Sequence, residues 1–128
     1  MSYYISKKVD YGFETAINKV TEELKKEGFG VLTQIDIKET LKKKLNVDLE
    51  KYTILGACNP TFAYEALQSE DKIGTMLPCN IIVQEHADGK VEVSAVDPVA
   101  SMMSVNKNSL GILATQVREK LNKVINNL

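Results

Sequence analysis

The sequence predicts an α+β domain, a two-layer sandwich in which a mixed sheet of about five strands carries helices mainly on one face. Two observations lead to this prediction. Segments with apolar residues at helical spacing alternate with short β-branched and aromatic segments, in the order β-α-β-α-β-α-β-β-α. No internal repeat, low-complexity tract or linker rich in Pro, Gly or Ser interrupts them. The 128 residues are therefore expected to form a single domain, 1–128, with one core.

The first strand and helix lie near the amino terminus. The segment "YYISKKV" (3–9) indicates a strand, and its two lysines suit the edge of a sheet. A helix follows, because apolar residues recur at helical spacing from Phe13 to Leu24. Gly28 is typical of a helix end, so this helix is expected to stop there.

Residues 29–45 supply the next strand and helix. The segment "FGVLTQI" predicts a strand in which alternate residues share one face, namely Phe29, Val31, Thr33 and Ile35. A helix then begins at Asp36, a favoured cap, with Glu39 placed to complete a capping box. It carries Ile37, Leu41 and Leu45 before "NVD" (46–48) ends it, and its run of lysines indicates a solvated face.

Three strands and a long helix make up the rest. "YTILGA" (52–57) predicts the third strand, and "NIIVQE" (80–85), apolar on both faces, belongs in the middle of the sheet. An Asp-Gly turn joins it to "KVEVSAV" (90–96), so the two should form a hairpin whose second strand is covered on one face. Apolar residues from Leu110 to Leu128 predict the last helix.

The two cysteines give the main candidate site, because each precedes an asparagine and lies within two residues of a proline. Asn59 is a favoured N-cap and Pro60 a favoured first helical residue, which places Cys58 at the entrance of a helix. The positive end of a helix stabilises a thiolate or a bound anion. The structural alternative is that Cys58 fills a tight corner between strand and helix as a small apolar residue.

Cys79 follows Pro78 at the start of the central strand, and its distance from Cys58 depends on the topology. If residues 71–76 carry the chain back after the short helix, then Cys58, Cys79 and Asp97 converge at one rim of the sheet. If the helix is a plain right-handed crossover, the two cysteines lie at opposite ends. The sequence leaves both open, and we expect the shared rim because six extended residues span about 20 Å.

Other residues that could take part in catalysis or metal binding are better explained by structural roles. Asp97 precedes Pro98 and is expected to cap a short helical turn. The only histidine, His86, lies next to a hairpin turn and is expected to be solvated. Two cysteines and one histidine without paired spacing do not predict a zinc site, so no metal is expected. No phosphate-binding loop, serine elbow or zinc-protease motif is present, and the sequence leaves the cofactor unknown.

Charge and hydropathy bear on the partners. Lys and Arg (16) nearly balance Asp and Glu (17), so neither nucleic acid nor a membrane surface is an expected partner. The amino terminus lacks the apolar core of a signal peptide, and no segment approaches the roughly 20 apolar residues that span a bilayer. We therefore expect a cytoplasmic protein whose cysteines are free thiols. An uncovered sheet face, or "MMSV" (102–105), offers apolar area for a homodimer.

Four segments together resemble one protein family. "GFGVLTQIDIKETLKKKL", "YTILGACNPTFAYEAL", "IGTMLPCNIIVQE" and "VEVSAVDP", in this order and spacing, resemble the domain-of-unknown-function family 302 over nearly the whole chain. The resemblance implies an α+β domain, allows for a dimer and assigns neither a reaction nor a catalytic residue. Genomic neighbourhoods link some members to sulfur metabolism, which makes thiol chemistry worth testing.

The sequence supports two hypotheses about function. The first is a binding module for a small anionic or thiol-reactive ligand at a rim formed by Cys58, Asn59, Cys79, Asn80 and Asp97. The alternative is a thiol-dependent enzyme or sulfur carrier, with Cys58 as nucleophile and Cys79 as resolving thiol. The alternative requires an accessible Cys58 of low pKa and Cα atoms within about 7 Å.

Overall fold

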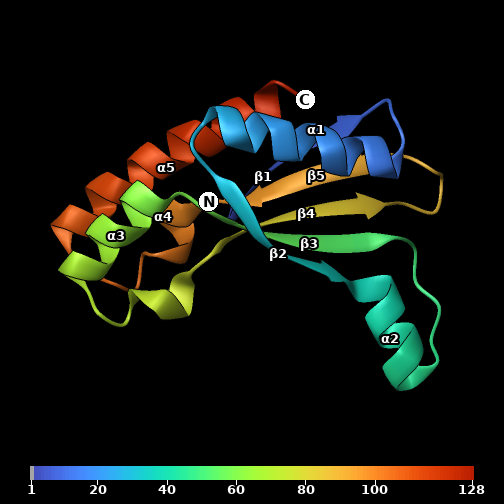
Figure 1. Cartoon of the computed structure of the whole chain (residues 1–128), viewed down its shortest axis with the longest axis horizontal. Coiled ribbons are helices and arrows are strands. Elements are labelled where there is room, and N and C mark those ends of the chain that lie inside the picture. Colours follow the sequence, from blue (N-terminus) through green and yellow to red (C-terminus); the bar gives the residue numbers. More distant parts are fainter. Residues whose placement is uncertain (1) are drawn as a thin grey trace.

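A computed structural model describes residues 2–128 (Figure 1). One sheet contains five strands: β1 (Tyr4–Val9), β2 (Gly30–Asp36), β3 (Tyr52–Cys58), β4 (Cys79–Glu85) and β5 (Val91–Val96). The helices are α1 (Phe13–Lys26), α2 (Ile37–Leu45), α3 (Pro60–Ser69), α4 (Pro98–Ser101) and α5 (Asn108–Asn126), with a 3₁₀ turn, η1 (Ile73–Met76), before β4. The α+β architecture and the predicted order of elements are confirmed.

The strands lie in the order β1-β5-β4-β3-β2, and every neighbouring pair is antiparallel. The expectation of a mixed sheet is corrected here. Because α3 and η1 return the chain to the end of the sheet where β3 finishes, β4 begins beside the end of β3 and runs opposite to it. Of the strands that follow one another along the chain, only β1 and β2 run in the same direction. They do not pair, because they form the two opposite edges of the sheet. The predicted places of β1 at an edge and β4 in the middle are confirmed.

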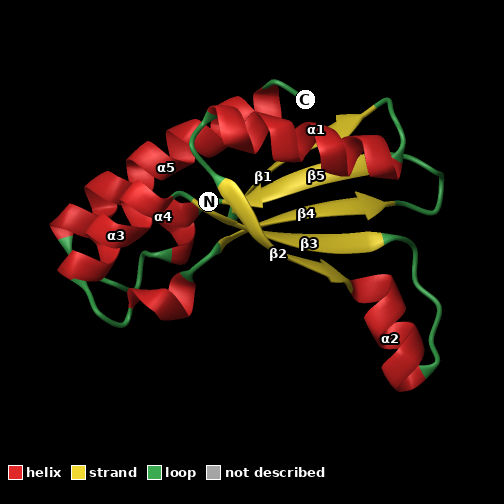
Figure 2. Cartoon of the chain, viewed as in Figure 1, coloured by secondary structure: helices red, strands yellow, loops and turns green. Residues whose placement is uncertain are grey.

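Helices α1 and α5 cover one face of the sheet and leave the other face open (Figure 2). Each contributes an apolar stripe whose members are buried: Phe13, Ala16, Ile17, Val20 and Leu24 on α1, and Leu110, Ala114, Val117, Leu121, Val124 and Ile125 on α5. The sheet supplies alternate residues of its central strands to the same core: Leu55, Ala57, Ile81, Val83, Val91, Val93 and Ala95. This is the period-2 alternation of a sheet covered on one side.

The end of α1 is fixed by its own backbone. Gly28 has φ of +85°, and its N–H donates to Lys25 O while the N–H of Phe29 donates to Leu24 O. These two bonds form a Schellman motif, which needs the left-handed conformation that glycine adopts without strain. Both Leu24 and Phe29 are buried, so the motif also turns the chain into the core before β2.

Strand β2 departs from the predicted alternation. The register shifts between Val31, which pairs with Ala57, and Thr33, which pairs with Gly56. A bulge at Leu32 therefore leaves Val31 on the covered face and moves Thr33 and Ile35 to the open face. The prediction that Phe29, Val31, Thr33 and Ile35 share one face was wrong, because a bulge inserts one residue and reverses the alternation beyond it.

Helix α2 begins and ends where the sequence indicates. The Asp36 carboxylate accepts from the N–H of Glu39 at 2.9 Å, and Asn46 closes the helix in the left-handed conformation. The helix projects away from the layer formed by α1 and α5 (Figure 1). Within residues 2–128, no helix combines the length and apolar character needed to cross a membrane.

Candidate functional site at the cysteine end of the sheet

The two cysteines lie at the same end of the sheet. Cys79 begins β4 and pairs in register with Ala57, the residue immediately before Cys58 in β3. Asp97 follows β5 at that end too, because Ile81 pairs with Ala95. The predicted convergence of Cys58, Cys79 and Asp97 at one rim is confirmed, and the alternative with cysteines at opposite ends is wrong.

A narrow pocket opens between this rim and helices α3 and α5. Its volume is about 40 Å³, and three of the predicted site residues, Cys58, Asn59 and Cys79, contribute to its wall. The other lining residues are apolar: Phe29, Ala57, Phe62, Ala63, Ala66, Leu77, Pro78, Pro98, Met102, Leu110, Leu113, Ala114 and Val117. The pocket therefore offers two thiols and an amide in an otherwise apolar wall.

The two thiols differ in environment. Both are free, but Cys79 is buried whereas Cys58 is half-buried. Burial, with a smaller contribution from the charge of Cys58, raises the pKa of the Cys79 thiol to about 11. Cys79 is therefore a neutral thiol at physiological pH. Since thiolates and not thiols attack sulfur, this disfavours Cys79 as a resolving nucleophile.

Asn59 occupies the N-cap position of α3, but its side chain makes no capping hydrogen bond. Instead Nδ2 donates to Glu27 O at the end of α1, at 3.2 Å. The turn at Gly28 brings that carbonyl within reach, and an added Cβ on Gly28 would lie 3.1 Å from Asn59 Nδ2. The predicted capping role is corrected: Asn59 ties the end of α1 to the start of α3 and so positions the rim beside Cys58.

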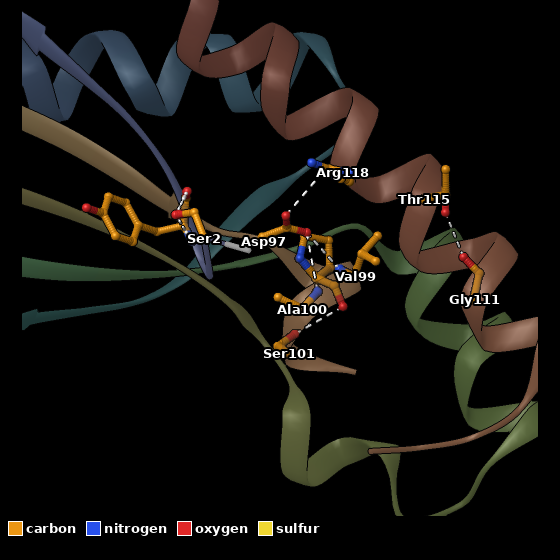
Figure 3. Close-up of polar contacts among 10 residues, drawn as sticks. Ser2, Asp97, Val99, Ala100, Ser101, Gly111, Thr115 and Arg118 are labelled. Carbon is orange, nitrogen blue, oxygen red and sulfur yellow. Dashed lines mark hydrogen bonds and ion pairs between the residues drawn. The ribbon is translucent and has the colours of Figure 1, made fainter. Parts of the chain in front are cut away.

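Asp97 has the capping role that the sequence favours. Its Oδ1 accepts from the N–H of Val99 at 2.9 Å, and its Oδ2 lies 3.2 Å from Arg118 Nε on α5 (Figure 3). Asp97 is only 3% exposed. Because both oxygens are engaged within the chain, this carboxylate holds α4 and α5 to the end of β5 and does not line the pocket.

Asn80 lies on the other side of the sheet. It follows Cys79, and successive residues of a strand point to opposite faces. Asn80 is exposed and lines a separate cleft of about 410 Å³ on the open face, together with Tyr3, Tyr4, Tyr52, Ile82, Gln84, Glu92, Ser94, Ala95 and Val96. The five predicted site residues are therefore divided between a pocket, an ion pair of buried Asp97 with half-exposed Arg118, and a second cleft.

A polar network beside this second cleft was not found from the sequence. The Ser6 hydroxyl donates to Glu92, Ser6 Oγ lies 2.9 Å from Ser94 Oγ, and His86 Nε2 lies 2.8 Å from Glu92 Oε1. Hydrogen bonds, first from Ser6 and then from His86, hold the pKa of Glu92 below its usual value. The expectation that His86 is solvated is corrected, because its ring is paired with Glu92.

A sequence signal existed for part of this network. Glu92 and Ser94 alternate with buried residues on β5, and His86 precedes the turn of the same hairpin. Ser6 had no such signal, because its place opposite Ser94 depends on pairing between the first and last strands. Among residues 2–128, no three His, Cys, Asp or Glu side chains gather as metal ligands.

Comparisons with known proteins agree with this architecture. The sequence profile of the family described as "Domain of unknown function DUF302" matches residues 5–128. The crystal structure of an uncharacterized conserved DUF302 protein from Bacillus stearothermophilus is similar, with a TM-score of 0.92 and 28% identity. That similarity covers 98% of this chain and 98% of the other. A comparison with curated proteins gives no match.

Proposed function

The chain belongs to the DUF302 domain family. From the geometry of the cysteine pocket, we propose that the protein is a binding module for a small, uncharged ligand that packs against thiol groups. The observation that carries the proposal is the pocket at the cysteine rim, which combines two free thiols with an apolar wall. Ligand sites in proteins are typically apolar concavities with a few polar groups that fix orientation. Here those groups are Cys58, Cys79 and Asn59.

The size of the pocket limits the ligand. One water molecule needs about 10–15 Å³ of such volume, so 40 Å³ accommodates a group of roughly three or four heavy atoms. A short alkyl thiol or thioether meets this limit and matches the soft sulfur atoms of the wall. A larger ligand would place only such a group in the pocket and leave the remainder at the mouth.

Neutral ligands are favoured over the anions that the sequence also allowed. The N-terminus of α3 provides partial positive charge, which favours an anion. However, none of the lining residues is a lysine or an arginine, and Arg118 nearby is held by Asp97. An ionised ligand would lose its hydration without gaining a counter-ion, and this costs several kcal/mol.

The thiol-enzyme hypothesis is the competing account. Its support is the half-buried Cys58 in the wall of the pocket, with a second sulfur at the same rim. Its difficulty is the neutral Cys79, which stays protonated far above physiological pH. The binding role needs no thiolate and is therefore the simpler use of the same residues.

An NMR titration tests the binding role. Amide resonances of ¹⁵N-labelled protein are followed during addition of 1-propanethiol, 1-propanol and propionate under reducing conditions. We expect saturable shifts at Cys58, Ala66 and Ala114 with the thiol, weaker shifts with the alcohol and none with propionate. Saturation by propionate alone would contradict the neutral-ligand proposal.

A matched pair of variants locates the site. Ala66→Leu fills the pocket from α3, where Ala66 is buried, and should abolish the titration. Ala87→Leu makes the same change in the exposed hairpin turn and should leave the titration unchanged. Binding that survives Ala66→Leu in a folded protein would place the ligand elsewhere.

The proposal also includes a homodimer. The apolar side chains that the single chain leaves exposed support it, among them Tyr3 and Leu45. This component is independent of the ligand, because the cysteine pocket lies on the covered side of the sheet.

A further inference from the structure

Helix α2 has no core of its own. It contains nine residues, and none of them is buried. Its apolar stripe, Ile37, Leu41 and Leu45, is at most half-buried, and Leu45 is 66% exposed. Isolated helices shorter than about 12–15 residues are marginal in water, so most helical stability comes from packing of the apolar face. Within residues 2–128 this stripe is only partly covered.

The residues after α2 extend the same apolar surface. We define the α2 arm as residues 37–49, that is, the helix and the segment that follows it. Val47 is 42% exposed and Leu49 is 40% exposed. Figure 1 shows the arm projecting from the end of β2.

The arm is continuous with the open face of the sheet. A cleft beside the arm is lined by Ile37, Leu49, Tyr52 and Gln84, and the larger open-face cleft shares Tyr52 and Gln84 with it. Further apolar side chains lie exposed along this surface, with Tyr3 at 72%, Tyr4 at 46% and Ile35 at 45%. One surface therefore runs from the arm across the sheet to the other edge.

The area of this surface is sufficient for an interface. At roughly 150–200 Å² for a fully exposed side chain of this size, the exposed fractions of Tyr3, Tyr4, Ile35, Leu45, Val47 and Leu49 amount to about 500 Å² of surface. A standard protein interface buries about 800 Å² per partner, of which a little more than half is apolar. The surface thus supplies one full side of a stable complex.

We propose that a second copy of this chain occupies this surface, with the α2 arm of each copy lying across the open sheet face of the other. The inference extends the proposed homodimer by naming its interface. A twofold interface must be self-complementary, and this surface carries both a protruding amphipathic helix and a recessed cleft of about 410 Å³. The Leu45 stripe of one copy enters the cleft beside Tyr52 and Ile82 of the other.

The pairing completes the open-face cleft. Asn80, Gln84 and Glu92 line that cleft in the single chain, with His86 bound to Glu92 at its side. In the proposed dimer the partner's arm covers these groups and forms the missing wall. Each cleft would then contain residues from both copies.

Sedimentation equilibrium between 1 and 200 μM tests the interface. We expect the wild-type chain to sediment as a dimer, and Leu45→Glu to weaken association at least 100-fold, because the symmetry places the charge in the interface twice. Leu45 is exposed in the single chain. The monomeric variant should therefore have the same circular dichroism spectrum and the same melting temperature as wild-type protein diluted until it is monomeric.

Ile112→Glu is the matched control on α5. Ile112 is 63% exposed and lies with Met103 on a different surface, which includes the "MMSV" segment. This variant should remain dimeric. A dimer lost by Ile112→Glu and kept by Leu45→Glu would overturn the interface but keep the homodimer, whereas a monomeric wild-type chain would overturn both.

Hydrogen exchange gives a second readout. In the dimer the amides of residues 37–45 should be protected, and dilution to submicromolar concentration should speed their exchange while those of β4 stay protected. Equal exchange of residues 37–45 at both concentrations, in a chain that sediments as a dimer, would place the interface elsewhere.

Discussion

At the scale of single residues, Gly56 is the position with least room. A Cβ added there would lie 2.2 Å from Thr33 Oγ1 and 2.9 Å from Pro78 Cγ. Thr33 is exposed on the edge strand and can rotate, but the Pro78 ring is fixed at the start of β4. We expect Gly56→Ala to lower the free energy of unfolding by about 1–3 kcal/mol, measured by urea denaturation.

Gly111 provides the comparison for Gly56. It lies within α5, and a Cβ built on it meets no atom within 4 Å apart from its chain neighbours and the backbone of its own helix. Gly111→Ala should therefore raise the free energy of unfolding by about 0.5–1 kcal/mol, the usual gain in a helix. Equal effects of the two substitutions would show that close packing at Gly56 is not the cause.

At the scale of elements, Asp97 joins β5, α4 and α5. Asp97→Ala removes both the cap on α4 and the pair with Arg118, and should lower the free energy of unfolding by on the order of 2 kcal/mol. Asp97→Asn keeps a capping oxygen and should cost less. Arg118→Ala should cost about 1 kcal/mol or less, because Arg118 is 46% exposed. Thermal melting of the three variants would contradict this assignment if Arg118→Ala were the most damaging.

At the scale of the whole molecule, Cys79 makes stability depend on alkaline pH. Its thiol has an ordinary pKa of 9.0 in the unfolded chain and about 11 when folded, so the folded state retains a proton that the unfolded state releases. The stabilisation that comes from this retained proton is complete below pH 9. As the pH rises toward 11, the free energy of unfolding falls by on the order of 2–3 kcal/mol.

Urea denaturation under reducing conditions at several pH values measures this loss. The wild-type curve is compared with that of Cys79→Ala, which removes the group and leaves all other titrations in place. Cys58→Ala should keep the slope, because burial is the main cause of the raised pKa. Parallel curves for wild type and Cys79→Ala would rule out the linkage.

The sequence predicted those elements whose signals are local. Helix ends at Gly28 and Asn46, the caps at Asp36 and Asp97, and the alternation of β5 each depend on a few neighbouring residues. Local signals of the same kind, the Asn and Pro residues near each cysteine, placed both cysteines at the ends of strands. What remained open was whether the connection from Cys58 to Cys79 returns or crosses, since that depends on the path of the chain in space.

Other features depend on contacts that the sequence does not display. The bulge at Leu32 adds one residue to an edge strand, and nothing in the segment distinguishes it from regular alternation. The side chain of Asn59 does not cap α3 but donates to the carbonyl oxygen of Glu27, 32 positions away in the sequence. Ser6 meets Glu92 only because β1 pairs with β5. In each case a distant partner decided the role of a residue whose local preference pointed elsewhere.

The pairing of β1 with β5 also sets an order of events during synthesis on the ribosome. Strand β1 is translated first, yet its register partner for Tyr4 is Val96, so it must wait for almost the whole domain to emerge. Strands β2 to β5 form a meander of neighbours that can assemble earlier, with the edge of β5 unpaired until β1 arrives. An unpaired edge invites aggregation of nascent chains. Lys7 and Lys8 place charge on this strand, a feature that discourages edge-to-edge pairing, and in the folded domain Lys7 donates to the carbonyl oxygens of Asn126 and Leu128.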